Sequence, residues 1–279
     1  MLPKHFIRTF FLLCLLAFSM AACDVLPTVT VNGTPITKSA KTTPAQSSAS
    51  TLNVWDRVAP GVELRTEVWT TPAGDSDMAT IVRFDLHHVK LSVGYQPSQP
   101  LLLSEWMQQE HATAVINGGY FDQENSASGF VVSNGQAFGS SYDGFGGMLS
   151  VDAQGRVGLR SLREQPYDPS EQLQQATQSS PMLVLPGGKR AQFSADASSS
   201  RRSVVAMDKQ GRLLFIVCPG LAFSLDELAD RLIASDLSID MALNLDGGAS
   251  TGLYVNAGSQ HVAIDSIAKL PIVVIVKAI

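Results

Sequence analysis

Residues 115–121 read VINGGYF and residues 243–251 read LNLDGGAST, and in both a β-prone apolar run ends on Asn or Asp before two glycines. Glycine lets the backbone turn through positive φ and leaves its N–H groups uncovered, so successive donors can point at one anion. We therefore expect two strand ends that approach the same ligand across one cleft. The alternative is that each Gly-Gly pair only marks a tight turn.

Strand and hairpin signals fill the sequence around these two turns. Apolar or alternating runs with turn residues between them predict antiparallel strands at Val62–Trp69, Ala79–Leu86 and Val89–Tyr95. Further strand pairs are predicted at the turn signals of residues 134–135, 152–155 and 208–211.

Two helices are predicted, and each precedes a buried strand. Leu101–His111 is the first, and Leu225–Ala234 follows Ser224, which forms a capping box with Glu227 three residues later. The strands that follow end at the two Gly-Gly turns, so they are expected to be comparable elements of one mixed sheet. The predicted fold class is α+β: a single domain with a mixed, largely antiparallel twisted β-sheet flanked by a few helices.

The first residues have the order of a secretory signal. Basic residues precede a short apolar stretch, and small residues then lead to Cys23. Residues 1–22 are therefore predicted to be a signal peptide of the lipoprotein type, with Cys23 lipidated as the mature N-terminus. Ordinary cleavage after Ala21 or Ala22 is the alternative.

The mature chain is predicted to consist of a tether and one domain. Residues 23–52 are rich in Ser, Thr, Ala, Pro and Lys and have few large apolar side chains, so burial cannot offset their ordering entropy. Residues 53–279 have the length of one large domain, and no second low-complexity break divides them.

The cysteines and the net charge limit where the protein can reside and what it can bind. Of the 3 cysteines only Cys218 lies in the predicted domain, where its apolar neighbours predict a buried, inert thiol. A net charge of -5 argues against nucleic acid, which requires a dense basic face. The predicted location is the cell envelope, lipid-anchored and facing the periplasm or exterior. In a Gram-negative cell, Asp24 resembles the signal for retention in the inner membrane.

Several further motifs follow one another between Ala112 and Tyr254. They are NGGYF (117–121), GFVV (129–132), SPMLV (180–184), RSVVA (202–206), LDELA (225–229) and ALNLDGGAS (242–250). This succession resembles the phosphodiester glycosidase family, from which CPG at residues 218–220 and Ala249 depart. The resemblance implies a mixed α+β fold with a cleft lined by these motifs. It also implies an exported bacterial hydrolase that cleaves a glycosyl-1-phosphodiester bond in a cell-envelope or phosphorylated glycan.

That chemistry needs a carboxylate and a means of stabilising an anion. The group leaving the anomeric carbon is a phosphate monoester, already a weak base, so one strong carboxylate can suffice. Asp246 is the first candidate, as nucleophile or as base for water, and Asp122 is the candidate second carboxylate. Arg202 is expected to grip the phosphate with a bidentate fork, with Arg201 as its neighbour.

Other polar groups near the two turns are candidates for substrate binding. The expected backbone donors are the N–H groups of Gly118, Gly119, Gly247 and Gly248, and the expected partners of sugar hydroxyls are Asn117 and Asn244. Structural alternatives exist, because Asp246 can form an Asx-type turn and an Arg pair at a strand start can be solvated edge charge. Tyr120 and Phe121 are expected to pack the core beside the cleft.

No metal-ligand spacing such as HExxH or CxxC occurs, so neither a catalytic zinc nor a required cofactor is predicted. A divalent cation held by oxygens such as those of Asp122 and Asp246 stays open, because such sites leave no short signature. Two other functions also stay open. One is a phosphodiesterase that cuts the P–O bond, and the other is an envelope lipoprotein that binds glycan without catalysis.

Overall fold

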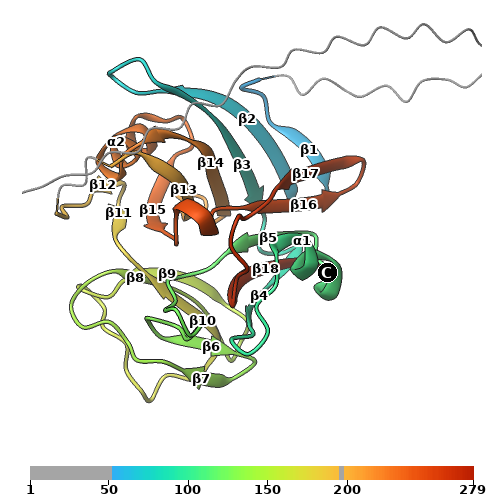
Figure 1. The fold of residues 1–279 in the computed structure, drawn as a ribbon, viewed down its shortest axis with the longest axis vertical. Helices are drawn as coiled ribbons and strands as arrows, with labels where there is room; N and C mark the ends of the chain where they lie inside the picture. The colour runs from blue at the N-terminus through green and yellow to red at the C-terminus, as the bar shows by residue number, and fades with distance from the viewer. Residues whose placement is uncertain (1–51, 195–197) are drawn as a thin grey trace, which may run out of the picture. The chain divides into compact units, whose positions relative to one another are not determined.

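Antiparallel sheets make up most of the structure, a computed structural model that describes residues 52–194 and 198–279 (Figure 1). The largest sheet has eight strands in the order β1-β2-β3-β14-β13-β15-β11-β12. Their bounds are β1 Asp56–Ala59, β2 Val62–Thr70, β3 Ser76–Phe84, β11 Met182–Leu185, β12 Lys189–Arg190, β13 Ser200–Asp208, β14 Leu213–Phe223 and β15 Ile239–Asn244.

Two five-stranded sheets hold the remaining strands of the described residues. The β5 sheet has the order β17-β16-β5-β18-β4, and the β8 sheet has the order β7-β6-β10-β8-β9. The bounds in the β5 sheet are β4 Val89–Tyr95, β5 Ala114–Asn117, β16 Leu253–Ala257, β17 Gln260–Ile264 and β18 Ile272–Ala278. Those in the β8 sheet are β6 Val131–Ser133, β7 Gln136–Phe138, β8 Gly147–Asp152, β9 Val157–Ser161 and β10 Leu173–Ser179.

The two predicted helices are confirmed as α1, Leu103–Glu110, and α2, Leu225–Ala234. The predicted capping box begins α2: the Ser224 hydroxyl accepts the N–H of Glu227 at 3.3 Å, and the Glu227 carboxylate accepts the N–H of Ser224 at 3.0 Å. These bonds satisfy backbone donors that have no partner inside the helix. A short 3-10 turn, η1 (Gly248–Ser250), follows the second Gly-Gly pair.

The main core lies between the eight-stranded sheet and the β5 sheet. Val82, Phe215 and Leu243 from the first sheet belong to the same buried cluster as Ile116 and Val255 from the second. Residues of β5 and β15 thus contribute to one core, although they pair with different strands. Packing of the two sheets brings the ends of these strands together.

Each helix covers the outer face of a sheet. Leu228 and Leu232 of α2 are buried with Ile216 of the eight-stranded sheet, and Trp106 of α1 is buried with Val273 of the β5 sheet. Leucines four residues apart lie on one helical face, which explains why α2 lies along the sheet. Figure 1 shows α2 and α1 on different sheets.

The predicted largely antiparallel strand pairing with a few helices is confirmed, but the α+β class and the single mixed sheet are corrected. The described residues are mostly β, in three antiparallel sheets with two short α-helices. In addition, β5 pairs with β16 and β18, whereas β15 pairs with β13 and β11, so the two strands do not share a sheet. Helix–strand order is local information, but sheet membership depends on partners far away in the chain, which the local pattern does not contain.

The predicted signal peptide at residues 1–22, the lipidation site Cys23 and nearly all of the predicted tether lie outside the described residues. The described residues belong to one compact unit, Ser48–Ile279. Within them no helix has both the length and the apolar character needed to cross a membrane. Cys218 is buried as predicted, and burial raises the pKa of its thiol, which agrees with an inert side chain.

Candidate active site

The two Gly-Gly turns are in direct contact, as the sequence predicts. The N–H of Asp246 donates to the carbonyl of Gly118 at 3.1 Å. The Asn117 amide donates to the carbonyl of Asp246 at 2.6 Å and accepts the N–H of Gly252 at 3.2 Å. Hydrogen bonds therefore tie the end of β5 to both ends of the loop that follows β15.

Strand register places Asp246 beside Arg202. In the β13–β15 pair, Val204 lies opposite Asn244, and the ladder continues because the N–H of Leu245 donates to the carbonyl of Ser203 at 2.9 Å. Side chains alternate between the faces of a strand, so extending the register by two residues brings Asp246 and Arg202 to the same face. Both candidates thus come from neighbouring strands of the eight-stranded sheet.

Asp246 is half-buried, and burial raises the pKa of its carboxyl. Hydrogen bonds from the Ser250 hydroxyl and the N–H of Gly247 oppose this effect and favour the ionised form. A direct ion pair with Arg202 would lower the pKa instead. Burial is thus the larger influence on this carboxyl, and a raised pKa suits a group that takes or gives a proton in catalysis.

The Arg202 guanidinium is buried, with a residue exposure of 7%, and two of its nitrogens bind backbone carbonyls. Nε donates to Phe223 at 3.0 Å and Nη2 to Ser198 at 2.6 Å. A Cβ placed on Gly247 would lie 3.9 Å from Nη1, so this nitrogen is directed at the loop after β15. Because carbonyls occupy the Nε–Nη2 edge, the expected bidentate grip on phosphate through that edge is not available.

The remaining charged candidates support loops. Arg201 donates from Nε to the carbonyl of Pro219 at 3.1 Å and from Nη2 to that of Asp265 at 2.9 Å. Asp122 is exposed, and its Oδ1 accepts the N–H groups of Glu124 at 3.0 Å and Ser126 at 2.8 Å. The structure thus gives Asp122 an Asx-turn role and Arg201 a bracing role.

The first pair of glycines is required for close packing, not for anion binding. The N–H of Gly118 donates to the carbonyl of Ile272 at 3.0 Å, and that of Gly119 to the Thr177 hydroxyl at 3.4 Å. A Cβ on Gly119 would lie 2.0 Å from the carbonyl oxygen of Gln178. These donors are therefore engaged within the protein, contrary to the expected anion-binding role.

In the second pair of glycines, Gly248 alone has a positive φ, at 59°. A Cβ on Gly247 would lie 3.0 Å from the carbonyl oxygen of Arg201, so this glycine permits the close approach of β13. The N–H of Gly247 faces the Asp246 carboxylate. Gly247 therefore acts on the candidate catalytic group itself, while Gly248 supplies the left-handed turn into η1.

Both predicted asparagines are buried. The Asn117 side chain connects the turns, as described above. The Asn244 amide nitrogen donates to the Tyr120 hydroxyl and to the Ser180 carbonyl, each at 2.9 Å. Its oxygen Oδ1 is buried and has no hydrogen-bond partner among the described residues. Asn244 therefore connects Tyr120 with Ser180, and its Oδ1 can still accept a hydrogen bond.

Two tyrosines near Asp246 were not among the predicted site residues. Tyr120 donates its hydroxyl to the Ser180 carbonyl at 2.8 Å, and burial, followed by the charge of Asp246, raises its pKa to about 12. Burial and Asp246 also raise the pKa of Tyr142. Gln178 accepts the N–H of Tyr142 at 2.8 Å and so positions it. The sequence could have indicated Tyr120 as a site residue, because it directly follows the first Gly-Gly pair, but no comparable motif lies next to Tyr142.

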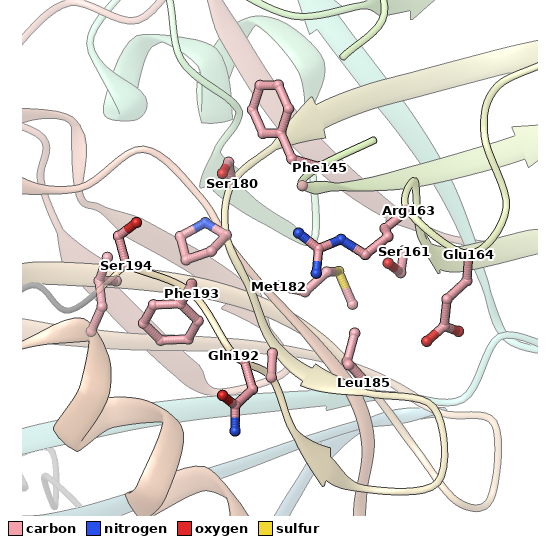
Figure 2. Close-up of a pocket in the computed structure, with 14 residues that line it drawn as sticks. Phe145, Ser161, Arg163, Glu164, Ser180, Met182, Leu185, Gln192, Phe193 and Ser194 are labelled. Atoms are coloured by element: carbon pink, nitrogen blue, oxygen red, sulfur yellow. The ribbon is translucent and has the colours of Figure 1, made fainter. Parts of the chain in front are cut away.

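A cavity of about 480 Å³ adjoins this cluster (Figure 2). None of the predicted site residues lines it, but Ser180, whose carbonyl binds Tyr120 and Asn244, is part of its wall. Phe145 also lines it and stacks on Tyr142, with ring centroids 4.7 Å apart. The cavity and the Asp246 cluster therefore share a border.

Metal ligands do not gather in the described part of the chain. No group of three or more His, Cys, Asp or Glu side chains there is arranged to hold a metal ion. His87 and His88 lie in the turn between β3 and β4, as expected, with the His88 ring 3.2 Å from the Asp85 carboxylate.

Comparison with known families identifies one match. The model of the phosphodiester glycosidase family matches residues 110–276, more than half of the chain. These residues include both Gly-Gly turns, Asp246 and Arg202. No curated protein matches the chain.

Solved structures with a similar fold include a zebrafish enzyme, N-acetylglucosamine-1-phosphodiester alpha-N-acetylglucosaminidase, whose catalytic domain is auto-inhibited by its pro-peptide. It is 18% identical with a TM-score of 0.62, and the match covers 80% of this chain and 85% of that chain. A Synechocystis protein is 15% identical with a TM-score of 0.55, over 78% of this chain and 62% of that one. A Burkholderia pseudomallei protein is 14% identical with a TM-score of 0.52, over 72% and 74%. At these identities the likeness shows the fold alone.

Proposed function

Because the chain belongs to the phosphodiester glycosidase family, we propose that it is an exported hydrolase that cleaves a glycosyl-1-phosphodiester bond. The substrate proposed is a cell-envelope or phosphorylated glycan. The observation that carries the proposal is the position of Asp246, half-buried with a raised pKa, beside Arg202 at the ends of two adjacent strands.

The reaction places attack at the anomeric carbon. Either Asp246 attacks directly and water later hydrolyses the glycosyl ester, or Asp246 takes a proton from the attacking water. In both routes the bond between the anomeric carbon and the ester oxygen breaks, and its electron pair leaves with the phosphate monoester. A weakly basic leaving group needs little protonation, which agrees with a site built around one buried carboxylate.

Stabilisation of the phosphate is assigned to the groups around that carboxylate. The Arg202 guanidinium, oriented through Phe223 and Ser198, contributes positive charge in a buried setting, where it acts more strongly than in water. Tyr142 and Tyr120 have raised pKa values and so stay protonated and neutral at neutral pH. The Tyr120 hydroxyl already donates to the Ser180 carbonyl, so Tyr142 is the candidate donor to the phosphate. These steps are proposed without a metal ion, and chelation tests whether a divalent cation is required.

The decisive experiment is hydrolysis of a sugar 1-phosphodiester in ¹⁸O-labelled water. Attack at carbon places the label in the released sugar, whereas a phosphodiesterase places it in the phosphate. We expect Asp246→Asn to lower kcat by at least about 10³-fold, because a neutral amide neither attacks nor accepts the proton. Asp168→Asn, at an exposed turn carboxylate, is the matched control. Full turnover by folded Asp246→Asn would overturn the catalytic role of Asp246, whereas no turnover by the wild-type protein would favour a role in glycan binding only.

A further inference from the structure

The cavity beside the Asp246 cluster has a mixed lining in which apolar surface exceeds polar surface. Its volume, about 480 Å³, falls within the range of small-molecule sites, roughly 300–1,000 Å³. Seven apolar side chains line it, Phe145, Pro181, Met182, Leu185, Ala191, Phe193 and Leu225, beside the polar side chains of Ser161, Arg163, Glu164, Ser180, Gln192 and Ser194. Phe145 is 48% exposed, so an apolar ring that faces solvent here has surface to bury against a ligand.

One cation enters this cavity. Figure 2 shows the Arg163 guanidinium directed into its centre, whereas the Glu164 carboxylate lies at the end away from Ser180. The Nε of Arg163 donates to the carbonyl of Gly144 at 3.4 Å, and within the described residues Arg163 forms no ion pair with a carboxylate. A guanidinium in such a setting favours an anion, and phosphate suits its geometry.

The border with the Asp246 cluster fixes how a substrate would span both sites. Ser180 belongs to the cavity wall and to the hydrogen bonds of Tyr120 and Asn244, and the Tyr142–Phe145 stack joins the two regions. A diester with its sugar at Asp246 would therefore direct its second ester arm past Ser180 into the cavity.

We propose that this cavity binds the second ester arm of the phosphodiester, that the arm it selects is apolar, and that Arg163 contacts the phosphate. The polar lining side chains can pair with some hydroxyl groups of a polyhydroxylated arm, but those that lie against the seven apolar side chains would lose water without a partner, which costs free energy. An alkyl or similarly apolar arm gains from the same burial. The substrate class is thus a sugar joined through phosphate to an apolar alcohol, an inference that rests on the proposed function.

The test uses calorimetry to measure how tightly ethyl, butyl and hexyl phosphate and glucose 6-phosphate bind to the full-length protein. Each buried methylene tightens binding about threefold to fourfold, so hexyl phosphate, which has four more methylenes than ethyl phosphate, should bind about 100-fold tighter if all four are buried and about tenfold tighter if two are. Glucose 6-phosphate should bind no better than ethyl phosphate. Equal affinity along the alkyl series, or tighter binding of the sugar phosphate, would overturn the proposal without any variant.

Variants then locate the effect. Phe193→Ala should remove most of the gain from ethyl to hexyl, while Arg163→Gln should weaken every alkyl phosphate by about tenfold and keep the gain. Ile267→Ala, an exposed apolar residue that does not line the cavity, is the control and should change neither. Chain-length dependence that is the same in all three folded variants would place the ligand elsewhere and reject this site.

Failure of this inference can be distinguished from failure of the proposed function. Binding of alkyl phosphates does not require turnover. If the protein binds them in this cavity but hydrolyses no sugar phosphodiester, the proposed subsite stands and the proposed reaction is rejected. Conversely, if the protein hydrolyses a methyl phosphodiester of a sugar and a longer alkyl arm does not raise kcat/KM, the proposed reaction stands and the proposed subsite is rejected.

Discussion

At residue 246, burial favours the neutral carboxyl group, whereas catalysis requires the ionised carboxylate. Burial raises the pKa of the Asp246 carboxyl, yet a nucleophile or base must be ionised to act. The hydrogen bonds from Ser250 and Gly247 resolve part of this conflict, because they favour the ionised form. The carboxylate is therefore poised for chemistry at a cost to the stability of the fold.

Asp246→Asn is expected to raise the thermal stability of the protein at pH 7. A folded-state pKa above the unfolded one means that this group stabilises the fold below the unfolded pKa of about 3.9. That contribution is lost as pH rises through the folded pKa, and Asn has no such loss. Thermal unfolding at several pH values checks this: the advantage of the variant should vanish at low pH, and a variant less stable than wild type at pH 7 would contradict it.

Arg202→Lys is expected to lower kcat/KM by about 100-fold, because an ammonium cannot keep both carbonyl bonds and still present charge to the site. Arg201→Lys is the matched control from the adjacent position, and its effect should stay below about tenfold, since that side chain braces loops. Steady-state kinetics on a sugar 1-phosphodiester measure both. Equal losses in the two variants would assign the site to neither arginine in particular.

Among the elements, the ends of β5 and β15 are the ones that build the site. The loop after β5 is pressed against β10 and β18, and the loop after β15 is pressed against β13. Glycine is needed at these points because no side chain fits between the backbones. Close packing of the strand ends, and not exposure of N–H groups, explains the first Gly-Gly pair.

Gly119→Ala is expected to destabilise the protein by about 3 kcal/mol, because its Cβ would lie 2.0 Å from the backbone oxygen of Gln178. Gly158→Ala in β9 is the control, since the nearest atom to its Cβ is the Ser150 hydroxyl at 3.8 Å and its φ is not positive. Denaturant unfolding of both variants measures the difference. A Gly119→Ala protein as stable as Gly158→Ala would show that the two turns can separate at little cost.

For the whole molecule, three sheets contribute to one site. Asp246 follows β15 of the eight-stranded sheet, Tyr120 follows β5, and Tyr142 precedes β8. Each of these elements also contributes to a buried core, so the distances among the polar groups are set by apolar packing. The site depends on the relative position of the sheets and not on any single loop.

Cys23→Ser is expected to release the protein from the membrane fraction, because the proposed anchor is a lipid on that cysteine. Mass spectrometry of the mature N-terminus checks the same proposal: it should begin at Cys23 and carry the mass of acyl chains. The variant should keep its activity on a soluble substrate, because Cys23 lies outside the described residues that form the candidate site. A mature chain that begins at Ala22 or at an unmodified Cys23 would establish ordinary cleavage instead.

Local patterns in the sequence predicted most elements. The apolar runs that became β2 and β4, the capping box at Ser224 and the Asn134-Gly135 hairpin all depend on residues a few positions apart, so the sequence alone contains them. The position of Asp246 at a strand end was predictable for the same reason.

Only the tertiary structure decided that β5 and β15 lie in separate antiparallel sheets, that Gly118 and Gly119 pack against backbone, and that Asp122 caps its own turn. It also brought Tyr142 near Asp246 and Ser180 to Asn244, in each case between segments far apart in the chain. These outcomes depend on long-range pairing and burial, which the whole chain selects together and no short window records.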